Sequence, residues 1–180
     1  MIIHVSDHIV LKEIELSDSI DVFNTIDTQR KYLGQWLPFV EYTQAVDDSR
    51  DFIQSVLDTL IETRDLTFIV QYDGSFAGLI GFKGTDKANK KSEIGYWLSD
   101  GYQKNGIMTD SVKALMEYAF SKMNMNRIQI RCGVGNQPSR NIPRRLGFHF
   151  EGIERAGELF PDGRFIDLEV YSKLKDEVEK

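Results

Sequence analysis

The chain has 180 residues, of which 41% are hydrophobic and 28% are charged, a composition typical of a globular protein with a full core. Its formal net charge of -6 argues against a general affinity for nucleic-acid backbones or anionic membranes. A single cysteine, Cys132, excludes an internal disulfide and a multi-cysteine metal site, and the three histidines show no metal-ligand spacing.

The N-terminus has no basic region followed by a long apolar run, and no apolar stretch approaches membrane-spanning length. These features predict a cytoplasmic protein that has neither a signal peptide nor a membrane partner. Together with the negative charge, they also predict no direct nucleic-acid partner.

Apolar spacing predicts both strands and helices in the first part of the chain. A strand at 9–14 leads to a helix that Ser17 or Asp18 can cap, and the residues expected to face inward are Ile20, Val22, Phe23 and Ile26. The aromatic segment 32–39 has no clean period, and we interpret it as a buried joint between helices, with the lining of a pocket as the alternative. The clearest helix spans about 46–63, where apolar residues recur at Phe52, Ile53, Val56, Leu57, Leu60 and Ile61.

The rest of the chain is also predicted to contain both strands and helices. Strands are predicted at 66–72 and 76–82, joined by the hairpin signal Asp73-Gly74 and followed by a polar loop at 83–91. The later elements are a strand at 93–99, a helix at about 109–122, a strand at 127–134, a short helix at 136–146, and strands at about 148–159 and 164–173.

The sequence shows no internal repeat, low-complexity segment or interdomain linker, so we expect a single domain over residues 1–180. The order of elements predicts the α/β (α+β) class, in which helices pack on a mostly antiparallel sheet.

The stretch 93–109 carries the first chemical signal. The strand is broken at Gly101, and a glycine-containing loop then feeds the start of a helix. Several backbone N–H groups converge in such a loop and, with the helix dipole, suit a phosphate or pyrophosphate, to which Lys104 adds a positive charge. A single glycine loop is more often an ordinary strand-to-helix turn, so the prediction needs a second signal.

That second signal is the stretch 136–148. Asn136 can cap the short helix, and Pro138 is tolerated in its first turn. Pro143 removes one internal hydrogen bond, and the freed carbonyl belongs to Ser139 by the helix rule. This carbonyl either serves a ligand or meets water.

Together these stretches resemble the Gcn5-related N-acetyltransferases (GNAT), and within them the group that acetylates the N-termini of ribosomal proteins. Glu-Ile-Gly-Tyr-Trp-Leu at 93–98, followed by Gln103, Gly106 and Met108, resembles the acetyl-CoA pyrophosphate loop, although Met108 stands where Gly or Ala is usual. The other pieces are Asn136 and Ser139 with Leu146-Gly147-Phe148, and Glu151-Gly152, Gly163 and Asp167 with Tyr171.

The resemblance implies the family fold, a mostly antiparallel sheet of about seven strands with flanking helices. In that fold the strand before the loop and the strand at 127–134 run parallel and splay apart, so that the pantetheine arm of the cosubstrate acetyl-CoA enters the gap. No metal is implied. The family often forms dimers, which leaves a homo-oligomer open.

Residue roles follow from the resemblance and from what acetyl transfer needs. Backbone N–H groups near Trp97 and Leu98 are expected to polarise the thioester carbonyl, and Asn136 to bond the pantetheine. The pyrophosphate is expected to be held by Gln103, Lys104, Asn105, Gly106, Met108 and Thr109. Glu93 is the candidate base, acting through water, and its alternative is an exposed carboxylate at a strand end. Ser139 is the candidate proton donor to the thiolate, and its alternative is a helix hydroxyl bonded to backbone.

Three smaller expectations complete the residue assignments. The cluster Arg140, Arg144 and Arg145 meets the 3′-phosphate or forms a solvated face. Cys132 is expected to be a small buried hydrophobic residue rather than a nucleophile. Trp36 and Phe39 are expected to bind the acceptor near the mouth of the cleft.

Three functions are consistent with these observations. The first, which we favour, is acetylation of the N-terminal α-amino group of a protein that begins with a small residue such as serine. The second is acetylation of a small amine, such as a polyamine, an amino sugar or an antibiotic. The third is a non-enzymatic module that binds acyl-CoA.

Overall fold

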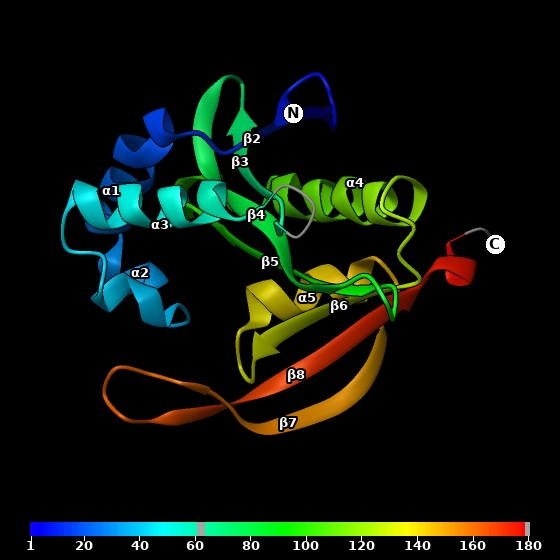
Figure 1. Ribbon diagram of the computed structural model, residues 1–180. Helices are drawn as coiled ribbons and strands as arrows, with labels where there is room; N and C mark the ends of the chain where they lie inside the picture. The colour runs from blue at the N-terminus through cyan, green and yellow to red at the C-terminus, as the bar shows by residue number, and fades with distance from the viewer. Residues whose placement is uncertain (61–63, 179–180) are drawn as a thin grey trace. The chain divides into compact units, whose positions relative to one another are not determined.

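The computed structural model describes residues 1–60 and 64–178 and is drawn in Figure 1. The chain divides into two compact units, the first comprising residues 1–81 and 96–107 and the second residues 82–95 and 108–180. Each unit therefore combines two separate stretches of sequence. Strands β4 (Ser75–Asp86) and β5 (Lys91–Leu98) carry the chain from one unit to the other.

The sheet of the first unit has the strand order β1-β2-β3-β4, with β1 at Ile2–His4, β2 at Ile9–Glu13 and β3 at Thr67–Tyr72. All three neighbouring pairs are antiparallel. Asp73 and Gly74, which join β3 to β4, have φ angles of 48° and 77°. Positive φ at both positions is what a two-residue type I′ turn requires, so the predicted hairpin is confirmed.

Helices of the first unit pack on this sheet. They are α1 (Ser19–Thr28), α2 (Arg30–Leu33), α3 (Val46–Asp58) and 3-10 helices at Leu16–Asp18 and Pro38–Glu41. Their shared core consists of buried Ile14, Val22, Ile26, Leu33, Val40, Ile53, Ile69, Leu79 and Trp97. The segment 32–39 is thus largely the buried joint that the sequence favoured, since Tyr32 and Leu37 pack against this core.

Two expectations for these helices are wrong. Ile20 is 54% exposed, because α1 turns Val22 and Ile26 toward the core, and residues two apart lie on nearly opposite sides of a helix. Helix α3 ends at Asp58 rather than near 63, since Thr59 is already extended, with ψ 136°. Residues 61–63 of the predicted helix lie outside the described residues.

The second unit has the strand order β5-β6-β8-β7, with β6 at Arg127–Gly133, β7 at His149–Leu159 and β8 at Phe165–Leu174. Its helices are α4, which begins at the boundary of the units (Ile107–Ser121), α5 (Gln137–Arg145) and a 3-10 helix at Lys175–Glu177. Figure 1 shows α5 in yellow beside β6, and β7 and β8 as a long hairpin.

The pairing of β5 with β6 is parallel, and the pairings of β6 and β7 with β8 are antiparallel. The parallel register runs only from Lys91 beside Arg127 to Glu93 beside Gln129, although β6 continues to Gly133. A mostly antiparallel sheet with one parallel pair confirms the predicted fold class, and the short register is what a diverging pair produces.

The structure corrects the strand count and the polar loop. The described residues contain eight strands rather than about seven, because β1 was not predicted. The loop at 83–91 shortens to 87–90, since β4 extends to Asp86 and β5 begins at Lys91. The end of β4 and the start of β5 carry polar rather than alternating apolar side chains, and the hydroxyls of Thr85 and Ser92 are hydrogen-bonded at 2.8 Å. Among the described helices, none is long and apolar enough to cross a membrane.

Buried and more exposed side chains alternate along β6, and this alternation positions the residues of the site. Ile128, Ile130 and Cys132 are buried, so the side chains of Arg127, Gln129 and Arg131 point to the opposite face of the strand. The two faces of β6 therefore carry different chemistry.

Candidate active site

The loop that follows β5 belongs to the first unit and is tied to the end of α1 by neutral hydrogen bonds. Gln29 Nε2 donates to Ser99 Oγ at 2.8 Å, and Gln29 Oε1 accepts from the Asp100 backbone N–H at 2.9 Å. The Ser99 backbone N–H donates to the Ala77 carbonyl at 2.8 Å. One glutamine side chain therefore fixes the point at which the strand becomes a loop.

Tyr32 holds the middle of the same loop. Gln103 Nε2 donates to the Tyr32 hydroxyl, which in turn donates to the Leu98 carbonyl at 3.4 Å. Burial raises the pKa of the Tyr32 phenol, although its hydrogen bond with Gln103 acts in the opposite direction. The sequence placed Tyr32 in the segment 32–39 but did not predict its contacts with Gln103 and Leu98, because these partners lie 71 and 66 positions away along the chain.

The loop then turns into α4 through two residues with left-handed backbone, Lys104 (φ 66°) and Gly106 (φ 75°). Lys104, Asn105 and Gly106 are exposed, so their backbone groups are accessible at the start of the helix. Unpaired N–H groups of a first helical turn favour an anion. The Met108 side chain is only 4% exposed and packs inward, so this unusual residue does not project over the loop.

Three further residues assigned from the sequence also lie in the first unit. The Trp97 ring is buried and contacts Phe76, with ring centroids 5.8 Å apart, so its side chain serves the core. Trp36 is half-buried, and Phe39 is 40% exposed on its 3-10 helix. The binding of an acceptor by Trp36 and Phe39 stays a prediction.

In the second unit, α5 reaches β6 on its buried face. Asn136 Oδ1 accepts from the Ser139 backbone N–H at 3.2 Å, which confirms the predicted cap. Burial raises the pKa of the Cys132 thiol to about 11, and a hydrogen bond with the Ser139 side chain partly opposes this rise. Cys132 is 5% exposed, as expected of a small buried residue, and at neutral pH it is a thiol rather than a nucleophilic thiolate.

The basic cluster of α5 is divided. Arg140 Nε lies 3.4 Å from Glu169 Oε2, and the Tyr171 hydroxyl donates to the same carboxylate at 2.5 Å. Arg144 and Arg145 are exposed. The structure thus gives Arg140 a partner inside the fold and leaves the other two arginines on the surface.

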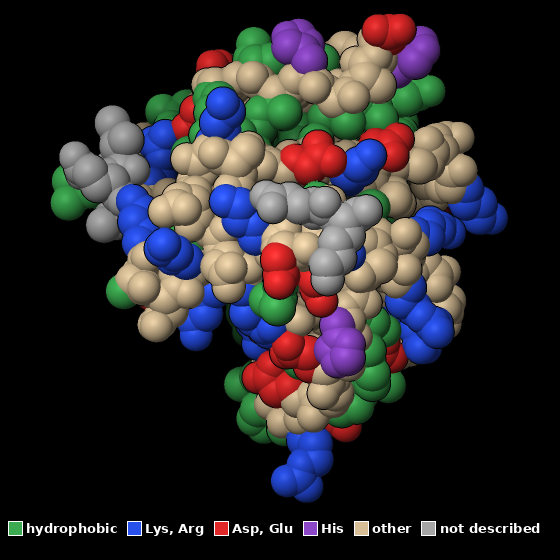
Figure 2. Space-filling view, turned by 90° about the vertical axis from the view of Figure 1, so that its right-hand side faces the viewer, with side chains coloured by type: hydrophobic (Ala, Val, Ile, Leu, Met, Phe, Trp, Pro, Cys, Tyr) green, Lys and Arg blue, Asp and Glu red, His purple; other side chains and the backbone are tan. Residues whose placement is uncertain are grey.

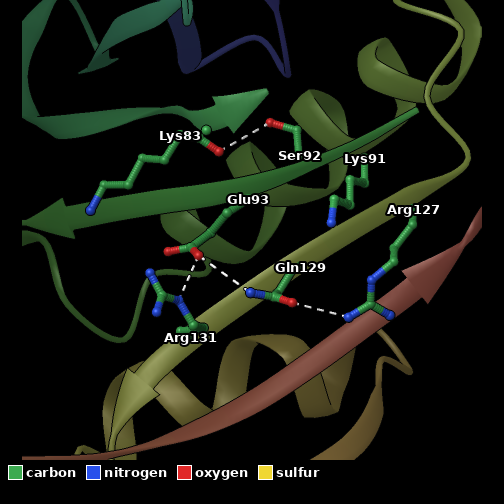
Figure 3. Close-up of a pocket in the computed structure, with 8 residues that line it drawn as sticks. Lys83, Lys91, Ser92, Glu93, Arg127, Gln129 and Arg131 are labelled. Atoms are coloured by element: carbon green, nitrogen blue, oxygen red, sulfur yellow. Dashed lines mark hydrogen bonds and ion pairs between the residues drawn. The ribbon is translucent and has the colours of Figure 1, made fainter. Parts of the chain in front are cut away.

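Glu93 lies on the opposite face of β6, in a cavity of about 260 Å³ (Figure 3). The cavity is lined by Lys83, Gly84, Lys91, Ser92, Glu93, Arg127, Gln129 and Arg131. Arg131 Nε donates to Glu93 Oε2 at 2.6 Å, and Gln129 Nε2 donates to the same oxygen at 3.4 Å. The Glu93 side chain is 15% exposed, so it is not the freely solvated carboxylate of the alternative interpretation.

Acidic residues of β7 pair with two of the cations that line this cavity. Arg131 Nη1 donates to Glu154 at 3.0 Å. Burial lowers the pKa of Arg131, but the hydrogen bonds and charges of Glu93 and Glu154 outweigh burial and raise this pKa overall. Arg127 forms two hydrogen bonds with Glu151, of 2.5 and 2.7 Å, and lowers the pKa of that carboxyl to about 2. Burial raises the pKa of Glu158. Charges of both signs are also interspersed on the face drawn in Figure 2.

The predicted site residues therefore divide between the two units. Those in the first unit are Trp36, Phe39, Trp97, Leu98, Gln103, Lys104, Asn105 and Gly106, and those in the second are Glu93, Met108, Thr109, Asn136 and Ser139. Within the second unit, Ser139 and Glu93 approach β6 from opposite faces, through Cys132 and Gln129 respectively. Arg131 and Lys83 were missed, because an isolated cation in a strand carries no local signal. In the described parts of the chain, no group of three metal-binding side chains occurs.

Known proteins resemble this chain over most of its length. Residues 8–149 match the acetyltransferase (GNAT) domain family. The putative ribosomal N-acetyltransferase YdaF of Bacillus subtilis (strain 168) is 37% identical over 178 residues, covering 97% of this chain and 96% of that protein. A solved structure of RimL, a ribosomal L7/L12 alpha-N-protein acetyltransferase in complex with coenzyme A, superposes with a TM-score of 0.92 and 26% identity over 98% of this chain and 99% of that one.

A spermidine N(1)-acetyltransferase of Escherichia coli (strain K12) is also related, with 26% identity over 155 residues, or 86% of this chain and 80% of that protein.

Proposed function

The chain belongs to the GNAT acetyltransferases, and from that premise we propose that it transfers the acetyl group of acetyl-CoA to the N-terminal α-amino group of a protein, in particular a ribosomal protein that begins with a small residue such as serine. The observation that carries the proposal is the 37% identity to the putative ribosomal N-acetyltransferase YdaF over nearly the whole of both chains. An acceptor on the ribosome would place the enzyme in the cytoplasm. Because each unit takes residues from two interleaved stretches, we treat residues 1–180 as one acetyltransferase domain.

We assign acetyl-CoA to the loop and to the start of α5. The accessible backbone of Gln103–Gly106, continued by Met108 and Thr109, suits the pyrophosphate, with Lys104 as a nearby charge. Asn136 would bond the pantetheine, and the backbone near Trp97 and Leu98 would polarise the thioester carbonyl. The left-handed backbone at Lys104 and Gly106 supports this assignment, because it turns successive N–H groups toward one point.

We assign the chemistry to Glu93 and Ser139. The acceptor amine must lose a proton as its nitrogen bonds to the acetyl carbon, and Glu93 would take that proton through water. The bond between carbon and sulfur then breaks, and Ser139 would protonate the departing thiolate. The positions of Glu93 and Ser139 on opposite faces of β6 support these separate roles, because the acceptor amine and the thioester would approach the strand from opposite sides. The ion pair with Arg131 would keep Glu93 oriented.

The main alternative is a polyamine acceptor, and the relationship to a spermidine acetyltransferase gives it weight. The net charge of -6 would also attract a polycation. However, four cationic side chains line the cavity around Glu93, those of Lys83, Lys91, Arg127 and Arg131. Carboxylates pair with Arg127 and Arg131, so among the described residues the charge that remains unpaired at the cavity is that of the two lysines. This local charge disfavours a polycation next to Glu93 and supports the peptide acceptor.

The test is a thiol-release assay with acetyl-CoA and a panel of acceptors: a Ser-initiated peptide, an Ala-initiated peptide, spermidine and an aminoglycoside. We expect release with the peptides and a product in which mass spectrometry finds the acetyl group on the α-amine. Ser139→Ala should lower kcat more than it weakens acetyl-CoA binding, because a proton donor to the thiolate acts in the transition state. Efficient acetylation of spermidine with no peptide product would overturn the proposal, and acetyl-CoA binding without turnover on any amine would indicate a binding module.

A further inference from the structure

The cavity around Glu93 is built from successive layers along the parallel strands. The register places Lys91 beside Arg127 and Glu93 beside Gln129. Residues two apart on a strand share a face and lie about 7 Å apart. A pair of cations therefore lies one layer from the carboxylate that we assign to the acceptor amine.

A third cation approaches Glu93 from the other side. A Cβ atom added at Gly95 would lie 2.7 Å from Lys83 Cε and 3.2 Å from Lys83 Nζ, so the Lys83 side chain lies directly across Gly95. Figure 3 shows Lys83 on one side of Glu93, and Lys91 and Arg127 on the other. The absence of a side chain at residue 95 is thus what gives Lys83 its place over the strand.

The cations that line the cavity differ in whether a carboxylate pairs with them. Arg127 is paired with Glu151, and Arg131 is paired with Glu93 and Glu154. Lys83 and Lys91 are exposed, and neither has a carboxylate within ion-pair distance among the described residues. Lys83 acts electrostatically on Glu158, and Lys91 on Asp86, without direct contact. The two lysines are therefore available to an anionic group that enters the cavity.

We propose that Lys83 and Lys91 select acceptor chains that carry Asp or Glu at the second or third position, an inference that rests on the proposed N-terminal acetylation. An extended acceptor with its amine at Glu93 advances about 3.3 Å per residue, so its third residue lies about 7 Å away. That distance matches the spacing of the layers. The side chain of the third acceptor residue would meet Lys91 if the acceptor runs toward that layer, and Lys83 if it runs the other way.

The experiment compares three peptides that differ at position 3 only: Ser-Ala-Glu, Ser-Ala-Gln and Ser-Ala-Lys, each followed by the same neutral sequence. With saturating acetyl-CoA, we expect kcat/KM for the Glu peptide to exceed that for the Gln peptide by about 3- to 10-fold, as for a charge pair near the surface. The Lys peptide should be the poorest. The preference should shrink above about 0.3 M salt, where screening is strong.

Charge reversal supplies the matched test. Lys91→Glu and Lys83→Glu, alone and together, should remove the preference for the Glu peptide, and the double variant should favour the Lys peptide. Lys113→Glu is the control, because Lys113 is exposed on α4 and does not line the cavity, and it should keep the order of the three peptides. Each variant is checked for an unchanged melting temperature and an unchanged response to acetyl-CoA.

The outcomes separate the two proposals. If the three peptides are acetylated equally, or if the reversals leave their order unchanged, the lysines do not select the acceptor, while N-terminal acetylation stands. If no peptide is acetylated and a small amine is, the proposed function itself fails.

Discussion

Two regions of the molecule are built on different physical principles. The loop after β5 is held by neutral hydrogen bonds, from Gln29 to Ser99 and from Gln103 to Tyr32, and offers its backbone to a ligand. The cavity around Glu93 is held by ion pairs between β5, β6 and β7 and offers charged side chains. Under the proposed assignment, the first region binds acetyl-CoA through its backbone, and the second binds the acceptor through charged side chains.

The difference has a measurable consequence. Backbone hydrogen bonds respond little to ionic strength, whereas partly exposed charges are screened within about 8 Å at physiological salt. Salt should therefore weaken the ion pairs that hold the cavity more than the hydrogen bonds that hold the loop.

The largest effect is expected from Gly106→Val. A branched residue is strained at φ 75°, and its side chain would stand where the pyrophosphate is expected. The parent at 100 times its Kd for acetyl-CoA should gain about 2.7 kcal/mol of stability, which appears as a higher Tm, and the variant should lose this gain. Gly101→Val is the matched control, since a Cβ there meets no atom within 4 Å, and a parent-like shift in Gly106→Val would place the ligand elsewhere.

Arg131→Met should have the next largest effect, and it should act on the acceptor side. It leaves Glu93 half-buried without its 2.6 Å partner, so the carboxylate is both destabilised and free to turn. We expect kcat/KM for a peptide to fall about tenfold and the pH–rate profile to shift, while the acetyl-CoA response is kept. An unchanged pH–rate profile would mean that Arg131 does not position the base.

The two regions also differ in what the sequence reveals. The loop was predictable because its signals are local: Gly106, Lys104 and the helix that follows are adjacent in the chain. The cavity was not predictable, because Arg131 meets its partners 38 and 23 positions away along the chain. The pairing of β5 with β6, and of β6 and β7 with β8, brings these residues together. The inward-facing prediction for Ile20 failed for a third reason: Val22 and Ile26 face the core, and Ile20, two residues before Val22, lies on nearly the opposite side of α1.

A smaller effect is expected from Tyr32→Phe, which removes one neutral hydroxyl from the loop. Gln103 would lose its acceptor, and the loop would lose one link to α2. A hydrogen bond of this kind contributes about 0.5–1.5 kcal/mol, so we expect acetyl-CoA affinity to fall about 2- to 10-fold, with little dependence on salt. Calorimetric titration at two salt concentrations checks this. A loss that grows with salt would contradict the neutral character of the loop.

The smallest effect concerns acid stability. Arg127 lowers the pKa of Glu151 from an ordinary value of 4.5 to about 2, so the charged carboxylate stabilises the folded state above pH 4.5. This contribution should be lost as the pH falls from 4.5 toward 2. Thermal melts across that range should show a steeper decline in the parent than in Glu151→Gln. Parallel declines would show that the pair contributes nothing measurable.

The acceptor is the central claim, and it is tested most directly by the ratio of kcat/KM for a Ser-initiated peptide to that for spermidine, measured on one preparation with saturating acetyl-CoA. An enzyme whose proposed base lies near two lysines that have no carboxylate partner among the described residues should favour the peptide by about 100-fold or more, and the ratio should fall in Lys83→Glu/Lys91→Glu. A ratio below one in the parent protein would contradict the account and identify a polyamine acetyltransferase.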